Sequence, residues 1–467
     1  MKKIYIITLL LLAGVFAQAQ TSVWDGSRKM WSRGAGTQDD PILIESAENL
    51  AFLSYMVGKG YDTQGLYFKL TTDIDLNGSE YQQWIPIGLL NEGYDEDGCP
   101  RNALPTCVSA QDVVFKGHFD GGDHSIANIY VNKENGAAGL FGVVSATEEN
   151  PVVVENVYVT SGFIKGYISG GIVGTYQSQN SGEILISRCW NGAEVQGRNA
   201  GGIVGEKASQ VRNCYNVGEV NGSYSAGGIV GSMANEVEEC YNNGAVTSGF
   251  MAGGIMGGVL NGDASVRNCY NTGNVSSSGA NAPASLPGNF VGGIVGFIWN
   301  GEHTMSNCYN VGLVSSDIRE PGGLVGNFGN SGIVENAYYL NTCGGEGEGE
   351  SKTADEMRAP SFVDVLNNGA NVWCADTLSV NGGYPILGAN NLAVDEHALN
   401  KLVVYPNPNH GRFTVEGTGV LTVFNMLGQT ILTQKVDGKV AMELPQGMYV
   451  VRLEGASGIR IAKMLVR

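Results

Sequence analysis

The sequence contains few of the patterns that mark enzymes and membrane proteins. Charged residues make up 15% of its 467 residues, with five histidines and thirteen prolines. There is no HExxH pair, no GxSxG turn and no phosphate-binding loop, which argues against zinc proteases, serine hydrolases and P-loop enzymes. Beyond the N-terminal segment, no run approaches the roughly eighteen apolar residues of a membrane-spanning helix. No transmembrane anchor is therefore expected.

The N-terminus has the features of a secretory signal peptide. Lysines at positions 2 and 3 precede an apolar run over residues 4–16, and small residues follow at positions 17 and 19. The run is too short to cross a bilayer as a helix. We expect residues 1–19 to be removed during export.

Charge is unevenly distributed along the chain, whose formal net charge is −18. Residues 401–467 hold eight Lys or Arg against four Asp or Glu, whereas residues 21–400 hold 17 against 41. Because a body this acidic repels phosphate backbones, we do not expect nucleic acid as a partner.

Glycine is abundant, at 69 residues, and much of it lies in a repeated corner. A motif of Cys, an aromatic residue and Asn precedes most of these corners, with a period of 26 residues that lengthens to 39 where residues 276–289 are inserted. The corners are GGIVG at 170–174, 201–205, 227–231 and 292–296, GGIMG at 253–257 and GGLVG at 322–326. The preceding motifs are RCWN at 188–191, NCYN at 213–216, 268–271 and 307–310, and ECYN at 239–242.

The repeats predict an all-β fold, a right-handed parallel β-helix. Short β-branched runs between Gly and Asn turns are typical of strands, and none has the 3.6-residue period of a helix. A unit of this size cannot bury its apolar face alone, so successive coils must stack about 4.8 Å apart. We expect an N-terminal cap and first coils at 20–136, repeat coils at 137–340 and a C-terminal cap at 341–389.

Stacking should align equivalent residues in ladders. We expect one ladder to contain free cysteines that pack as small apolar groups, and a second to contain asparagines joined by their side-chain amides. The cysteines are Cys189, Cys214, Cys240, Cys269 and Cys308, and the asparagines are Asn191, Asn216, Asn242, Asn271 and Asn310. Corner glycines such as Gly202 are expected where the backbone needs a positive φ or a close approach.

Two short helices are expected at the ends of the stack. Ser46 precedes an apolar period that ends near Gly58, and Thr353 with Glu356 forms a capping box that opens a second helix. We expect these helices to close the terminal coils, whose open edges otherwise invite pairing with other chains.

The glycine corners and NCYN strands resemble the GLUG motifs of bacterial adhesin-like and protease-associated surface proteins. The resemblance covers roughly residues 37–388, where GTQDDPILIESAENLAFL, YFKLTTDIDL, FDGGDHSI and NGGYPIL also match such proteins. It implies a β-helix, and the lack of an HExxH pair argues against the protease sometimes joined to these repeats.

A separate module follows a linker at 390–400. Residues 401–467 contain short alternating strands with glycine turns, which predicts a small β-sandwich. VYPNP, NMLGQ, LPQGMYVVRL and the terminal KMLVR resemble the C-terminal sorting domain of the type IX secretion system of Bacteroidetes. That resemblance implies the type IX machinery as a partner, and a mature protein that is secreted or attached to the outer-membrane surface.

Residues that depart from the repeat are the candidates for binding, because stacking already explains those that obey it. The candidate ligand-binding residues are Trp299, Glu302, His303, Tyr224 and Phe250, together with the insertion at 276–289. Aromatic side chains on one face of a solenoid can stack on sugar rings. We expect a glycan, or else a host or matrix protein, as the partner.

Two other sets of residues are candidates for metal binding and for disulfides. A loop with Asp95 and Asp97 has enough carboxylates to bind calcium weakly, but it lacks the spacing of a dedicated calcium loop, so no cofactor is expected. In an exported chain, Cys99 and Cys107 are candidates for a disulfide across a short loop. Cys343 and Cys374 are candidates for a second disulfide.

The sequence favours an exported structural or adhesin-like protein without catalysis, and we assign no catalytic residue. The alternative is a β-helix polysaccharide lyase or glycoside hydrolase. Such an enzyme needs a calcium-binding carboxylate cluster with a basic residue nearby, or paired carboxylates across a groove. The two hypotheses differ in whether acidic and basic side chains converge in one cleft.

Overall fold

The computed structural model describes residues 21–89, 113–388 and 402–466, apart from short gaps. The gaps are 134, 180–181, 261, 283–287, 328, 330–331, 377–379, 403, 406–411, 426–429, 446 and 456–457. The predicted signal peptide at 1–19 lies outside the described residues. The chain forms two compact units, which divide between Leu387 and Gly388 and are described separately below.

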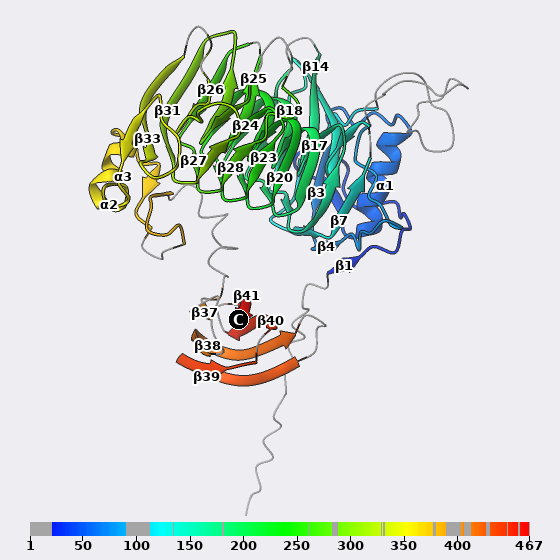
Figure 1. The fold of residues 1–467 in the computed structure, drawn as a ribbon. Helices are drawn as coiled ribbons and strands as arrows, with labels where there is room; N and C mark the ends of the chain where they lie inside the picture. The colour runs from blue at the N-terminus through cyan, green and yellow to red at the C-terminus, as the bar shows by residue number, and fades with distance from the viewer. Residues whose placement is uncertain are drawn as a thin grey trace, which may run out of the picture. The chain divides into compact units, whose positions relative to one another are not determined.

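The first unit is a parallel β-helix, as predicted (Figure 1). Its coils contribute to two long sheets, one of 23 strands and one of 11, in which successive coils pair in parallel. The 23-stranded sheet contains β1 Ser22–Val23, β2 Ile42–Ile44, β3 Tyr67–Leu70, β4 Ile74–Asp75, β5 His118–Asp120, β6 Ser125–Ala127, β9 Phe141–Thr147, β10 Val152–Glu155, β11 Tyr158–Val159, β14 Val173–Gln179, β15 Ile184–Ser187, β16 Trp190–Asn191, β18 Val204–Arg212, β19 Tyr215–Asn216, β21 Val230–Glu238, β22 Tyr241–Asn242, β25 Met256–Val259, β26 Ala264–Arg267, β27 Tyr270–Asn271, β30 Val295–Ile298, β31 His303–Asn310, β33 Ile333–Leu340 and β34 Glu350–Lys352. The 11-stranded sheet contains β7 Ile129–Asn132, β8 Ala137–Ala138, β12 Gly162–Lys165, β13 Ile168–Gly170, β17 Glu194–Gly201, β20 Val220–Gly227, β23 Val246–Ser248, β24 Met251–Gly253, β28 Val275–Ser277, β29 Phe290–Gly292 and β32 Val314–Ser316.

Equivalent residues of successive repeats stack in register. Val204 pairs with Val230, and Val220 pairs with Val246, so apolar side chains of successive coils form columns inside the solenoid. These valines are at most 1% exposed. The 26-residue period therefore corresponds to one coil, and its apolar positions supply a single continuous core.

The predicted asparagine ladder is confirmed. Asn191 Nδ2 donates to Asn216 Oδ1 at 2.8 Å, and this contact repeats from coil to coil as far as Asn310. Each of these amides also donates to a carbonyl two residues along its own chain, such as that of Gly218. All five side chains are fully buried, so their hydrogen bonds are made within the fold.

The predicted cysteine ladder is also confirmed as a row of buried free thiols. The backbone N–H of Cys214 donates to Cys240 Sγ at 3.4 Å, and Cys189 and Cys269 make the same contact to the next coil. The residue before each ladder cysteine lies in the left-handed backbone region, for example Asn213 at φ 54° and Asn268 at φ 53°. Asparagine tolerates this region better than most residues, which explains the first letter of the NCYN motif.

Gly202 occupies its corner because of close approach. A Cβ atom there would lie 2.1 Å from the carbonyl oxygen of Gly228 and 2.4 Å from Cγ of Asn216, whereas the φ of Gly202 is outside the left-handed region. Of the two reasons expected for a corner glycine, lack of space therefore applies here.

The first predicted helix closes the N-terminal end of the core. Helix α1 spans Ala47–Gly58, its N-cap Ser46 accepts from the backbone of Asn49, and its side chains Leu50 and Leu53 belong to the solenoid core. The helix ends as expected at Gly58.

The second predicted helix begins at the expected capping box, but it covers a different surface. Helices α2 Ala354–Arg358 and α3 Pro360–Asn367, with the hairpin of β35 Trp373–Cys374 and β36 Ile386–Leu387, pack on an outer row of stacked tyrosines. Tyr270 and Tyr309 stack at 5.1 Å, and Phe362 of α3 meets Tyr309 edge-on. Because these tyrosines point away from the core, the C-terminal cap covers the flank of the last coils.

The second unit is antiparallel. Its described strands are β37 Val404–Tyr405, β38 Arg412–Asn425, β39 Thr430–Glu443, β40 Gly447–Gly455 and β41 Gly458–Val466, bonded into one five-stranded sheet. Alternate residues such as Val415, Val423 and Val451 are buried in a core of their own. The described strands of this unit therefore have a hydrophobic core distinct from that of the solenoid.

Candidate functional site

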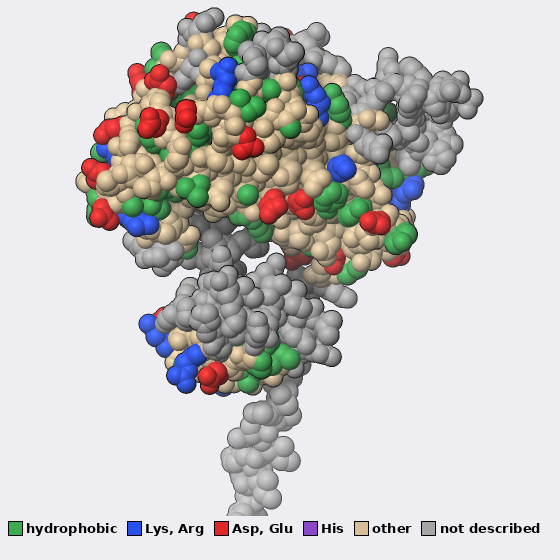
Figure 2. All heavy atoms as spheres, viewed as in Figure 1, with side chains coloured by type: hydrophobic (Ala, Val, Ile, Leu, Met, Phe, Trp, Pro, Cys, Tyr) green, Lys and Arg blue, Asp and Glu red, His purple; other side chains and the backbone are tan. Residues whose placement is uncertain are grey.

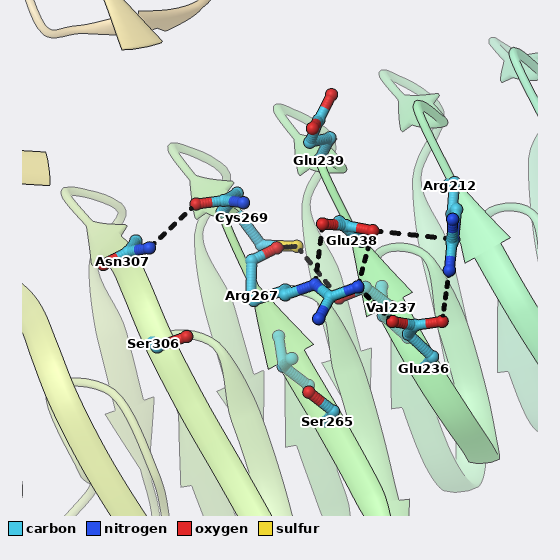
Figure 3. A network of polar contacts seen from close by, with 12 residues as sticks. Arg212, Glu236, Val237, Glu238, Glu239, Ser265, Arg267, Cys269, Ser306 and Asn307 are labelled. Atoms are coloured by element: carbon cyan, nitrogen blue, oxygen red, sulfur yellow. Dashed lines mark hydrogen bonds and ion pairs between the residues drawn. The ribbon is translucent and has the colours of Figure 1, made fainter. Parts of the chain in front are cut away.

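Acidic and basic side chains of three coils converge on the outer side of the large sheet (Figure 3). Arg212 on β18, Glu238 on β21 and Arg267 on β26 occupy one register position. Arg212 Nη2 donates to Glu236 Oε2 at 2.6 Å, and Arg267 Nε donates to Glu238 Oε1 at 2.6 Å. Each glutamate therefore bridges two arginines, and Glu238 holds the pKa of Arg267 above its ordinary value.

This charged network joins coils to one another. Its glutamates and arginines are paired with each other on the surface of the sheet. Such pairs help to hold neighbouring strands in register, whereas a residue that transfers a proton to a substrate must be free to contact it. In the described part of the chain, no group of three or more His, Cys, Asp or Glu side chains is arranged to hold a metal ion.

The visible face of the solenoid unit carries apolar, acidic and basic side chains singly or in small groups, scattered among other side chains and backbone atoms (Figure 2). A groove of about 590 Å³ lies on the 11-stranded sheet, where β12, β17, β20 and β23 run side by side. Its lining residues are Lys165, Gly166, Tyr167, Gln196, Gly197, Arg198, Asn221, Gly222, Ser223, Thr247, Ser248, Gly249, Ser278 and Asn281.

Glycines form the floor of the groove. A Cβ atom on Gly222 would lie 2.2 Å from the carbonyl oxygen of Ser225, and one on Gly249 would lie 2.2 Å from that of Ser223. Side chains are therefore excluded from the floor, while polar side chains of neighbouring positions line the sides. The result is an open hollow on a rigid sheet, with Lys165 and Arg198 among its lining residues.

One polar side chain per coil follows the groove. Lys165, Gln196, Asn221 and Thr247 pair in register along the stack, which spaces them about one coil apart. From the predicted insertion, Asn281 Nδ2 donates to the carbonyl oxygen of Ser223 at 2.8 Å, which brings the insertion to the end of the groove.

Arg198 lies between two aromatic rings at the groove. Its guanidinium carbon is 4.1 Å from the centre of the Tyr224 ring and 5.5 Å from that of Tyr167. The Tyr167 side chain is 45% exposed, so it offers a ring to a ligand. None of the described lining residues is an aspartate or a glutamate.

The structure brings only some of the predicted ligand-binding residues to a surface. Trp299 is 42% exposed and stacks on Phe297 at 5.7 Å, and the backbone N–H of Glu302 donates to Asp263 Oδ1 at 2.8 Å. His303 is only 3% exposed, which rules it out as a surface contact. Its position at the start of β31 turns the imidazole inward, and burial lowers its pKa.

Phe250 is likewise a core residue. It is fully buried in a small apolar cluster with Met251, Phe290 and Phe297, where the coil before the insertion meets the coil after it. Tyr224 packs against Phe250 at 5.1 Å and also underlies Arg198, so its role is to support the groove. The five predicted residues therefore do not form one site.

The predicted disulfide between Cys343 and Cys374 is absent. Cys343 is a buried free thiol in the solenoid core, whereas the strand with Cys374 belongs to the C-terminal cap on the flank. Cys343 and Trp373, the neighbour of Cys374, belong to two different hydrophobic clusters. The candidate disulfide of Cys99 and Cys107 and the candidate calcium residues Asp95 and Asp97 lie outside the described residues.

A second hollow of about 270 Å³ lies beside the N-terminal cap, lined by Trp24, Tyr55, Trp84 and other residues. Two of its polar side chains are already hydrogen-bonded within the protein. Trp24 Nε1 donates to the carbonyl oxygen of Ser27 at 2.8 Å, and Ser54 Oγ donates to that of Ile85 at 2.6 Å. The groove is larger and is lined by a row of polar side chains with two cations, so it is the stronger candidate.

Comparison with known proteins identifies the C-terminal module. Residues 403–467 match the family described as a secretion system C-terminal sorting domain. This is the sorting domain of type IX secretion, so the protein is secreted or attached to the cell surface. No helix among the described residues is long and apolar enough to cross a membrane.

Two further proteins resemble the chain. Over 167 residues, it is 29% identical to a protein of Evansella cellulosilytica provisionally named a Gly-rich membrane protein, a match that covers 35% of this chain and 16% of that protein. A solved structure from Bacteroides ovatus, provisionally described as an immunoglobulin A1 protease, has a TM-score of 0.48 at 22% identity and covers 76% of this chain and 95% of that one. At these values the likeness carries no inference about activity.

Sequence reasoning missed Lys165, Tyr167 and Arg198. They lie in the same turn of successive coils as Tyr224 and Phe250, directly ahead of the glycine corner. The signal that could have found them is this variable turn, compared position by position between coils.

Proposed function

We propose that the chain is an exported, adhesin-like binding protein that acts without catalysis and presents its groove to a glycan. The observation that carries the proposal is the groove itself, with its glycine floor, its row of amide and hydroxyl side chains and the exposed ring of Tyr167. Sugars offer hydroxyl groups and apolar ring faces, which such a lining complements.

The position of the groove on stacked strands supports a binding role. Its row of polar side chains is carried by β12, β17, β20 and β23, which are paired on both sides within the sheet, and Tyr167 lies in the turn that follows β12. A site built on such elements is organised before the ligand arrives, which lowers the entropic cost of binding.

We also propose that the coils are GLUG repeats, on the basis of their glycine corners and NCYN strands. The pairing of Arg212 and Arg267 with Glu236 and Glu238 supports a structural role for the most concentrated group of charges. A lyase or hydrolase would instead require such groups to be free and to face a cleft.

A glycan array, combined with polysaccharide degradation assays on the same purified protein, tests the proposal. We expect binding to a subset of glycans and no release of reducing or unsaturated ends. Tyr167→Ala should weaken binding, whereas Tyr61→Ala removes a ring of similar exposure elsewhere and should not. Degradation of any bound polysaccharide would contradict the non-catalytic role, and binding unaffected by Tyr167→Ala would contradict the groove.

A further inference from the structure

We propose that the groove binds an acidic saccharide, one that carries a carboxylate, through Lys165 and Arg198. This inference rests on the proposed function and specifies the class of glycan that the groove takes.

The groove differs in charge from the body around it. Residues 21–400 hold 17 Lys or Arg against 41 Asp or Glu, yet the described lining of the groove includes two cations and no carboxylate. The carboxylate of Glu194 adjoins the lining, where it accepts from Gln196 Nε2 at 2.7 Å. Among the described residues, no ion pair engages the exposed Lys165 or the half-buried Arg198. A local cationic site on a strongly acidic surface selects for an anionic group that reaches into it.

The Arg198 guanidinium is held in a position from which it can bind a carboxylate. Its guanidinium is held over the Tyr224 ring at 4.1 Å, so one flat face is occupied and its conformation is restricted. The N–H groups at the edge of a stacked guanidinium remain available, and they match the two oxygens of a carboxylate. Lys165, in register with Gln196 two residues before Arg198, adds a second positive charge on the neighbouring coil.

The remaining lining favours a saccharide over other anions. Gln196, Asn221 and Thr247 place one hydrogen-bonding side chain on each successive coil, and Tyr167 adds an exposed ring. A chain of sugars presents hydroxyl groups along its length and can use each of these contacts. A polyphosphate chain would carry further charges into the acidic surroundings, which oppose it.

A peptide is less suited to this surface. Peptides that add to sheets require an unpaired strand edge, but β17 is bonded to β12 and β20, and β20 is bonded to β17 and β23. An acidic peptide would therefore have only its side chains with which to bind the groove.

The test is calorimetric titration of the full chain with oligogalacturonate, hyaluronan oligosaccharide and sialyllactose, each beside a neutral counterpart. We expect at least one acidic saccharide to bind, and neutralising its carboxylate by esterification to weaken binding about tenfold or more. The double variant Lys165→Gln/Arg198→Gln should lose a similar factor. Lys29→Gln/Lys207→Gln removes the same net charge at exposed positions outside the groove and should leave affinity within about twofold.

The outcomes separate this inference from the proposed function. If neutral glycans bind as tightly as acidic ones and Tyr167→Ala still weakens them, the groove binds glycans but the acidic class is wrong. Poly-glutamate that competes as well as the saccharide would show charge attraction without sugar recognition, and would overturn the inference. Absence of binding to every saccharide, acidic and neutral, would overturn both proposals.

Discussion

Asn216 donates its side-chain amide to Asn242 Oδ1 in the next coil at 2.9 Å, and the same nitrogen donates to the carbonyl oxygen of Gly218 at 2.8 Å. One side chain thus bonds a neighbouring coil and its own turn at once. Because Asn191 donates to Asn216 in the same way, the ladder links each coil to those on either side. No water competes for these bonds, since the side chains are fully buried.

Replacing Asn216 by alanine should destabilise the solenoid by about 3 kcal/mol or more, because it leaves buried donors and acceptors unpaired in two coils. Asn243→Ala is the matched control. That asparagine is exposed and accepts from Thr272 Oγ1 at 2.9 Å, so its loss should cost no more than about 0.5 kcal/mol. Denaturant unfolding of both variants measures the difference, and equal losses would contradict the ladder.

Gly202→Ala should destabilise the protein by about 2 kcal/mol or more, because the added Cβ meets the backbone of the next coil at 2.1 Å. Gly262→Ala provides the contrast. Gly262 has φ +96° but no atom within 4 Å of the added Cβ, so only backbone strain of about 1 kcal/mol is expected. Thermal unfolding of the two variants tests this prediction. A smaller decrease in melting temperature for Gly202→Ala than for Gly262→Ala would show that space is not limiting at the corner.

The sequence predicted the coils and both ladders because stacking repeats the same physical demand in every turn. It predicted the starts of the two helices from the capping residues Ser46 and Thr353. An apolar or glycine position that recurs every 26 residues has the same neighbours above and below, so its environment follows from the repeat. The left-handed backbone conformation at Asn213 also recurs in every coil of the ladder. The sequence showed the recurring asparagine but not its conformation.

The groove could not be predicted in the same way. Phe250 and Tyr224 both break the repeat, yet one is fully buried and the other lies under Arg198. Departure from a repeat shows that a position is special, but it does not show which way the side chain points. That direction depends on the path of the turn and on contacts with residues from the insertion, such as Asn281.

Glu239→Asn should stabilise the protein. Glu239 has φ 51° at the position that Asn213 and Asn268 occupy in neighbouring coils, and asparagine relieves about 0.5–1 kcal/mol of backbone strain there. Burial also raises the pKa of Glu239, so its ionised form is disfavoured in the folded state. The free-energy cost of ionising Glu239 in the folded protein is absent at low pH, where the carboxyl is protonated. It grows as pH rises above about 4.5.

The gain from Glu239→Asn should therefore be larger near pH 7 than near pH 4, as measured by urea unfolding at both values. Asn268→Glu, the reverse change one coil along, should destabilise the protein with the opposite pH trend. A gain from Glu239→Asn that is equal at both pH values would rule out the electrostatic part of this explanation.

Stability should also decline in mild acid because of His303. Its imidazole is 3% exposed, and this burial lowers its pKa. Below about pH 6.5 the unfolded chain binds a proton that the folded chain excludes, so the free energy of unfolding falls as pH decreases. His303→Phe should reduce this slope, by at most about 1.4 kcal/mol per pH unit, in unfolding measured between about pH 5 and pH 7.5. An unchanged slope would contradict the assignment.

We propose the groove on the 11-stranded sheet as the ligand site. Its most direct test is a crystal structure of the protein with the tightest-binding saccharide from the array. We expect the saccharide to lie along the row of Gln196, Asn221 and Thr247, against the Tyr167 ring and within hydrogen-bonding distance of Arg198. A saccharide bound instead in the hollow beside Trp24 and Tyr55, with the groove empty, would contradict it.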